Sequence, residues 1–155
     1  MTQKREKISE LIELWQGREL DAHYLGFFDC FNRQLYFEAH EVLEALWLEQ
    51  RDGADGAFYK ALIQLAGAFV HLQKRRPGPA GRLLDLAEAN LKTYPDIHRH
   101  LDVRAVRNLI GVWRQRIGSD PTELPQKTDD LNPRLSLERS SGVECRDGGI
   151  EFRSV

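Results

Sequence analysis

Polar side chains that could do acid, base or metal chemistry lie inside an apolar helical pattern at residues 36–47, YFEAHEVLEALW. His40 and Glu44 are four residues apart, so a helix places them on one face, with Glu41 about a quarter turn away. A neutral imidazole beside a carboxylate can act as a general acid or base. The same pair supplies part of a divalent-metal site, provided that further ligands come from elsewhere in the chain.

A second stretch, residues 62–71 with the sequence LIQLAGAFVH, is predicted to form the other wall of this cluster. If the chain turns at RDGADG, residues 51–56, antiparallel helices pair residues whose numbers add to about 107. Similar arithmetic across the preceding turn puts His23 near Glu44. The predicted shared face contains His40, Glu44, Gln64 and His71, with Gly67 and Ala68 leaving room between the backbones and Trp47 as a possible pocket wall.

Three interpretations of this cluster stay open. The first, which we favour, is a buried polar network that fixes the register of the helical hairpin. The second is a metal or ligand site with His40, Glu44 and His71 as the candidate metal ligands. The third is a catalytic site, for which no catalytic residue can be assigned. The HEVLE segment lacks the second histidine of the zinc-protease motif, because Glu44 occupies that position.

The elements that must position these residues are helices. Apolar residues recur at helical spacing up to Ile117, and the pattern predicts helices over about residues 8–15, 22–32, 35–49, 57–74, 80–94 and 103–117. Asp21 and Asp102 are predicted N-caps. Short connections favour an all-α fold, a compact bundle of antiparallel helical hairpins that forms one helical domain over residues 1–118.

The chain from residue 119 to residue 155 has a different character. It holds three of the six prolines and five Lys or Arg against eight Asp or Glu, with little helical periodicity. We predict an irregular C-terminal tail that is disordered over residues 119–142. Alternating apolar residues on either side of Asp147-Gly148, from Val143 to Phe152, predict a short β-hairpin near its end.

Composition and charge exclude several classes of protein. The net charge is −2, and no stretch approaches the roughly 20 apolar residues of a membrane span, so we expect a cytoplasmic protein with no membrane contact. Nucleic-acid binding is a minority interpretation, because the sequence shows neither an aromatic platform nor a wide basic face. The cluster of Lys74, Arg75, Arg76 and Arg82 could bind phosphate, although capping of a helix C-terminus explains it more economically.

Three spaced segments together resemble a known family. They are FNRQLYFEAHEVLEALW, ALIQLAGAFVHLQKRRPGPAGRLLDLAEANL and YPDIHRHLDV, which span about residues 20–110. They are similar to the small bacterial and archaeal proteins grouped as domain of unknown function 309. That family is typified by a His-Glu-x-x-x-Glu-x-x-Trp-like helix, here His40, Glu41, Glu44 and Trp47, and by a Leu-Ile-Gln…His helix, here ending at His71. The resemblance implies an all-helical fold with a shared polar cluster and no established activity.

Two functions follow from these observations. The first is a non-enzymatic structural or interaction module, with possible self-association and an unknown protein partner; the paired hairpins also resemble a single tetratricopeptide-like unit, although a repeat array needs about three. The second is a metal-dependent hydrolase or small-ligand-binding protein that uses His40, Glu41, Glu44 and His71 with a divalent metal. In that case Gln64 would position the ligand.

Overall fold

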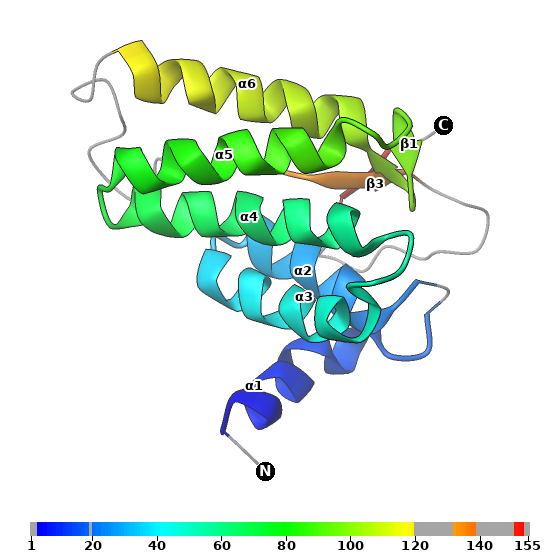
Figure 1. Cartoon of the computed structure of the whole chain (residues 1–155). Coiled ribbons are helices and arrows are strands. Elements are labelled where there is room, and N and C mark those ends of the chain that lie inside the picture. The colour runs from blue at the N-terminus through cyan, green and yellow to red at the C-terminus, as the bar shows by residue number, and fades with distance from the viewer. Residues whose placement is uncertain (1–2, 19, 120–131, 139–150, 154–155) are drawn as a thin grey trace.

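Helices make up most of the structure, as the sequence predicts. The computed structural model describes residues 3–18, 20–119, 132–138 and 151–153. Figure 1 shows α4 in the middle of the molecule, with α5 and α6 stacked on one side of it, α3 and α2 on the other, and α1 outermost. None of the helices in these ranges is long and apolar enough to cross a membrane. The helices are α1 Gln3–Ile12, the 3-10 turn η1 Glu13–Trp15, α2 Ala22–Asn32, α3 Tyr36–Gln50, α4 Gly56–Gln73, α5 Pro77–Leu91 and α6 Val103–Ser119.

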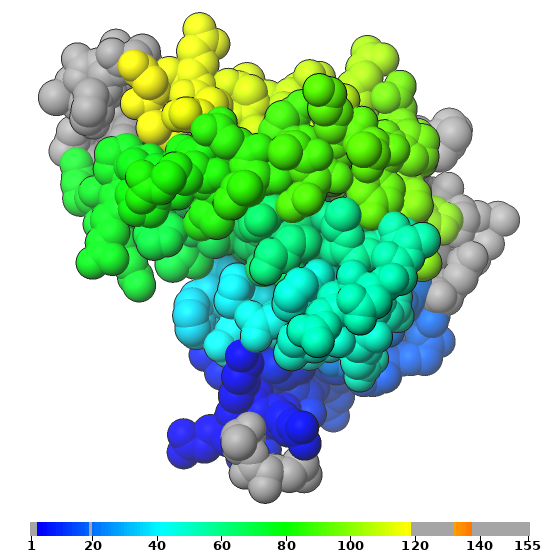
Figure 2. Space-filling model, viewed as in Figure 1, coloured from blue at the N-terminus to red at the C-terminus, as the bar shows by residue number. Residues whose placement is uncertain are grey.

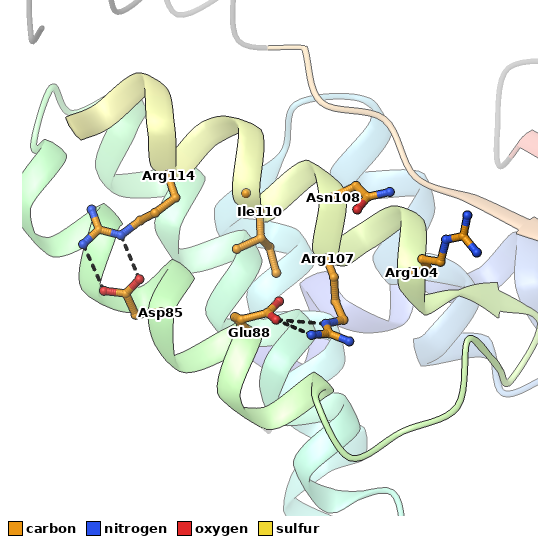
Figure 3. A pocket seen from close by; sticks show the side chains of 8 residues that line it. Asp85, Glu88, Arg104, Arg107, Asn108, Ile110 and Arg114 are labelled. Atoms are coloured by element: carbon orange, nitrogen blue, oxygen red, sulfur yellow. Dashed lines mark hydrogen bonds and ion pairs between the residues drawn. The ribbon is translucent and has the colours of Figure 1, made fainter. Parts of the chain in front are cut away.

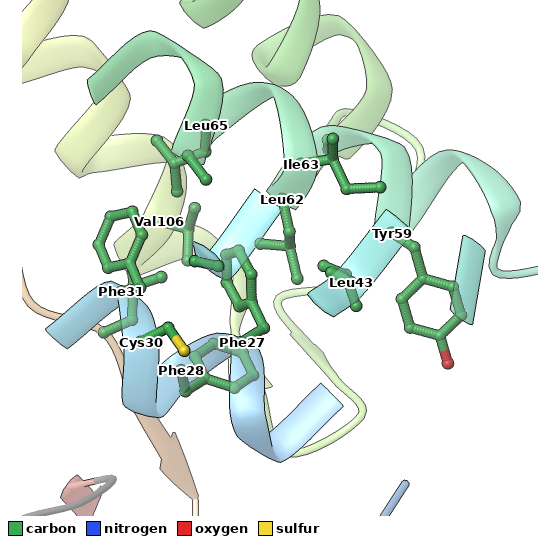
Figure 4. Packing of buried hydrophobic residues seen from close by; sticks show 14 of the residues in the cluster. Phe27, Phe28, Cys30, Phe31, Leu43, Tyr59, Leu62, Ile63, Leu65 and Val106 are labelled. Atoms are coloured by element: carbon green, nitrogen blue, oxygen red, sulfur yellow. The ribbon is translucent and has the colours of Figure 1, made fainter. Parts of the chain in front are cut away.

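The second helix, α2, lies at the centre of the core. All of its residues except His23 are buried, because its sequence is apolar on every side. The aromatic rings of Phe27, Phe28 and Phe31 are fully buried and meet side chains from α3, α4 and α6 (Figure 4). Cys30 is buried beside them, and burial raises the pKa of its thiol to about 12, which makes it unreactive.

The predicted helix starts are confirmed where aspartate precedes the helix. Asp21 Oδ1 accepts a hydrogen bond of 2.7 Å from the backbone N–H of His23, and Asp102 Oδ1 accepts one of 2.9 Å from the backbone N–H of Ala105. The prediction for α5 was wrong by about one turn. This helix begins at Pro77 because proline, which has no N–H to leave unsatisfied, suits the first helical position.

Four short strands form a small sheet beside the helices. They are β1 Ile97–His98, β2 Leu101–Asp102, β3 Ser136–Glu138 and β4 Glu151–Arg153, in that order across the sheet. β2 pairs antiparallel with β1 and β3, whereas β3 pairs parallel with β4. Most of the predicted hairpin around Asp147-Gly148 lies outside the described residues. Within the predicted tail, Leu135 and Leu137 are buried, so this part of the chain completes the core.

The hairpin of β1 and β2 turns through two residues that both adopt a left-handed conformation. Arg99 has φ 46° and His100 has φ 61°, the backbone that a type I′ turn requires and that Asn-Gly usually supplies. Asp55 holds the turn in place: its carboxylate lies 2.6 Å from His98 Nε2 and accepts a 2.6 Å hydrogen bond from Arg99 Nε. Tyr24 Oη donates to the Arg99 carbonyl at 2.8 Å. The His98 side chain is therefore held by Asp55 beside the turn.

We expect Asp55→Asn to lower the free energy of unfolding by roughly 1.5–3 kcal/mol, because it weakens charge-assisted hydrogen bonds to a buried carboxylate. Burial raises the pKa of Asp55, but the hydrogen bonds from His98 and Arg99 outweigh it and hold the pKa below 3.8. The stabilisation is therefore present above about pH 4 and is lost as the pH falls further. In urea unfolding, the free energies of unfolding of the wild type and the variant should differ at neutral pH and become equal in acid. A constant difference between them would contradict this assignment.

Candidate functional site

The acidic residues of α3 face α1, which runs antiparallel to α3 and carries lysines at matching positions. Lys4 Nζ lies 3.4 Å from both Glu41 Oε1 and Glu44 Oε1. One turn further along, Lys7 Nζ lies 3.2 Å from Glu38 Oε1. The i, i+3 spacing of the two lysines matches the spacing of the three glutamates. Sequence reasoning missed these partners, although the complementary spacing was visible in the first helix.

His40 lies at the edge of this acidic row and is about two-thirds buried. Its Nε2 is 3.5 Å from Glu44 Oε2, and its ring stacks on that of Phe37 with the centroids 6.2 Å apart. Its Nδ1 atom is buried and has no hydrogen-bond partner among the residues that the structure describes. Burial lowers the pKa of His40 below 6.5, although the charges of Glu44 and Glu41 oppose the shift. The imidazole is therefore held in its neutral form near neutral pH.

The predicted partners on α4 face a different neighbour. Gln64 Oε1 accepts a 2.8 Å hydrogen bond from Asn90 Nδ2 on α5. A Cβ atom at Gly67 would lie 3.2 Å from Leu83 Cδ1, also on α5. Burial lowers the pKa of His71, and so do the charges of Arg76, Lys74 and Arg82 around the start of α5. The stripe that the sequence predicts on α4 is therefore real, but it is turned toward α5.

The register of the α3–α4 hairpin still agrees with the prediction. Lys60 Nζ lies 4.3 Å from the centroid of the Trp47 ring. These two residue numbers add to 107, as predicted for antiparallel pairs in this hairpin. What differs is the rotation of α4 about its own axis. His40, Glu41, Glu44 and Trp47 therefore share one environment, between α1 and α4, whereas Gln64 and His71 belong to another, between α4 and α5.

No metal centre is formed by the side chains that the structure describes. Over residues 3–18, 20–119, 132–138 and 151–153, no group of three or more His, Cys, Asp or Glu could hold a metal ion. Of the three candidate ligands, His71 has different charged neighbours from His40 and Glu44, because α4 turns it toward α5. In this geometry the histidine and glutamate of α3 meet a lysine instead.

A pocket of about 710 Å³ opens between α1 and α3. Its wall on α3 carries Glu41 and Glu44, and His23 also lines it, which agrees with the prediction that His23 lies near Glu44. Next to this pocket α1 meets α2 closely, because a Cβ atom at Gly26 of α2 would lie 2.9 Å from Ile12 Cγ2 of α1. The apolar part of the lining consists of Ile8, Ile12, Ala45 and Leu48, and its charged part of Lys4, Arg5, Glu41, Glu44 and Glu49.

A second pocket of about 450 Å³ lies between α5 and α6, and ion pairs span it (Figure 3). Arg114 makes two hydrogen bonds of 2.7 and 3.1 Å to the carboxylate of Asp85. Arg107 donates twice, at 2.9 and 2.7 Å, to Glu88 Oε1. These pairs tie the two helices together, so the charged lining of this pocket is largely used within the protein.

A comparison with known protein families finds a match for the helical hairpins in the middle of the chain. Residues 24–83 match the family model described as Domain of unknown function (DUF309). This match supports the family resemblance that the sequence suggests. The DUF309 segment runs from α2 into the first half of α5, so it contains His40, Glu41, Glu44, Trp47, Gln64 and His71 but neither α1 nor α6. No curated protein and no solved structure gives a significant match.

We expect the stability of the protein to fall as the pH drops below 6.5, partly because His40 stays neutral in the folded state. Since its pKa is lowered, the unfolded chain binds more protons in this range. In urea titrations of His40→Gln, the free energy of unfolding should therefore fall less between about pH 7 and about pH 5 than in the wild type. Glu44→Gln is the matched variant and should steepen the loss, because it removes the charge that raises the His40 pKa. Equal slopes in His40→Gln and the wild type would refute this.

Proposed function

We propose that the protein is a non-enzymatic helical module that acts by binding a partner, and that its His, Glu and Gln cluster serves packing and recognition. The observation that carries this proposal is the pairing of the candidate residues within the protein. Lys4 joins Glu41 and Glu44, and Glu44 also contacts His40. A general base or a metal ligand would instead direct its carboxylate or imidazole toward an open reaction site.

The polar side chains of α4, Gln64 and His71, support the same function. The amide of Gln64 is engaged by Asn90 across the α4–α5 interface, as expected for a side chain that fixes the register of two helices. His71 lies beside three positive charges, which lower its pKa and disfavour a bound cation there. Neither environment has the ligand set of a divalent metal site.

The pocket between α1 and α3 is the surface best suited to a partner. It has the size of a ligand pocket and combines an apolar wall with a charged rim. Glu49 on this rim makes no ion pair among the described residues, so it is available to a cationic group. The exposed side chain of Leu48 lies beside it. A partner that offers an apolar side chain next to a lysine or arginine would fit this combination.

The alternative is a metal-dependent hydrolase or small-ligand-binding protein that uses His40, Glu44 and His71. The described residues offer no observation that favours the metal, since no group of ligands comes together. A cytoplasmic location and self-association belong to our proposal as expectations from the sequence.

We predict that the purified protein carries no stoichiometric zinc, manganese or iron, and that adding these ions leaves the melting temperature unchanged. At neutral pH His40→Ala should lose the partly exposed contact of the neutral imidazole with Glu44, worth about 1 kcal/mol. For a chain of this length that loss corresponds to a drop in melting temperature of about 2–4 °C. Metal analysis by mass spectrometry and differential scanning calorimetry give both readouts.

Glu44→Gln is the matched control, because it breaks the same pair while keeping the size of the side chain. It should behave like His40→Ala in both assays. The metal alternative would be supported, and our proposal rejected, by one bound metal per chain that both His40→Ala and His71→Ala remove while the protein stays folded.

A further inference from the structure

The end of α4, the start of α5 and the end of α6 lie at one end of the helical stack (Figure 1), and all three segments carry basic residues. In Figure 2 the first turns of α5 and the last turns of α6 meet at the left end of the molecule. Residues 74–82 contain four basic residues and no acidic one, and α6 contains four arginines and no acid. We call this surface the basic end; it consists of Lys74, Arg75, Arg76, Arg82, Arg114 and Arg116.

The contacts show that these charges converge. Burial and the charges of Arg76, Lys74 and Arg82 all lower the pKa of His71 on the last turn of α4, so the three cations lie near it. A Cβ atom at Gly78 would be 3.7 Å from Arg82 Nη1, and one at Gly81 would be 2.8 Å from Arg114 Nη1. Arg82 and Arg114 therefore both lie over the first turn of α5.

Three charges of the basic end are not balanced within the described part of the chain. Asp85 is paired with Arg114, whereas Lys74, Arg76 and Arg82 make no ion pair there. The N-terminus of α5 adds further positive potential, because Arg76 at its N-cap offers no side-chain acceptor to the first N–H groups. A cation at a helix N-terminus is unfavourable for folding, so Arg76 is better explained by a bound anion than by stability.

Capping of the α4 C-terminus does not account for the cluster. The carbonyls of the last turn of α4 accept backbone N–H groups from residues 74–76, and no side-chain bond from Lys74 or Arg76 to these carbonyls is present among the described residues. The sequence alone suggested no wide basic face. The fold creates one, because it brings the end of α6 that carries Arg114 beside the first turns of α5.

We propose that the basic end binds the phosphodiester backbone of a nucleic acid. Arginine outnumbers lysine at this surface, and its planar guanidinium matches phosphate oxygens through paired hydrogen bonds. The charges extend over three segments instead of forming a cup for one phosphate, which fits a ligand with repeated charges. Residues 74–82 and 114–118 expose no large apolar side chain, so the surface has nothing to insert into a lipid membrane. Recognition of this kind reads the backbone and not the base sequence.

The test uses the full chain and a short fluorescent single-stranded RNA of mixed sequence, with binding measured by fluorescence anisotropy between about 50 and about 200 mM salt. We expect saturable binding that weakens as salt rises. The triple variant Lys74→Gln, Arg76→Gln and Arg82→Gln should weaken it at least about tenfold and lower the slope against log salt by about 2. The matched control, Arg51→Gln, Lys92→Gln and Arg104→Gln, has the same net charge and should bind like the wild type.

Each other outcome overturns the proposal. Equal loss of binding in the two triple variants would mean that net charge, not the basic end, governs binding. No binding by the wild type at about 50 mM salt would exclude the phosphodiester ligand. Tighter binding to poly-glutamate, or to vesicles that contain phosphatidylserine, would assign the surface to an acidic protein or to a membrane. Circular dichroism of both variants checks that each is folded.

Discussion

The structure depends on the burial of α2. This helix is apolar on every side, so the rest of the chain must cover all of it, and its fully buried phenylalanines each contribute about 1.5–3 kcal/mol by leaving water. α1 covers one side and approaches closely at Gly26. The C-terminal extended segment covers another side, where the Asn32 amide exchanges hydrogen bonds of 2.7 and 2.8 Å with the backbone of Leu135. The hairpin of β1 and β2 closes the remaining end through Tyr24.

This constraint explains which parts of the fold the sequence predicts. Helical periodicity and the aspartate caps locate the helices, because both signals are local. The hairpin arithmetic also gives the correct register, as the contact of Lys60 with Trp47 shows. Periodicity assigns Gln64 and His71 to one stripe but does not tell which neighbouring helix that stripe faces. That choice depends on how α4 packs between α3 and α5, which no single stretch encodes.

Long-range contacts are the part that could not be predicted. Asp55 binds His98 and Arg99 across more than forty residues, and the left-handed turn that it supports lacks the usual Asn-Gly signature. The extended segment at Leu135 likewise follows a stretch with little periodicity. In both places no local sequence pattern predicts the structure. A buried polar side chain, Asp55 or Asn32, instead fixes a segment that is distant in the sequence through hydrogen bonds.

The function proposed here follows from the division of the candidate cluster between two interfaces. The account requires that His40 and His71 are independent of each other and of metal. Imidazole resonances in nitrogen-15 NMR, followed against pH with and without zinc, test this most directly. The account predicts that each histidine titrates alone, below 6.5, and that zinc or substitution of the other histidine changes neither curve. A joint shift of both imidazoles on adding zinc would contradict it.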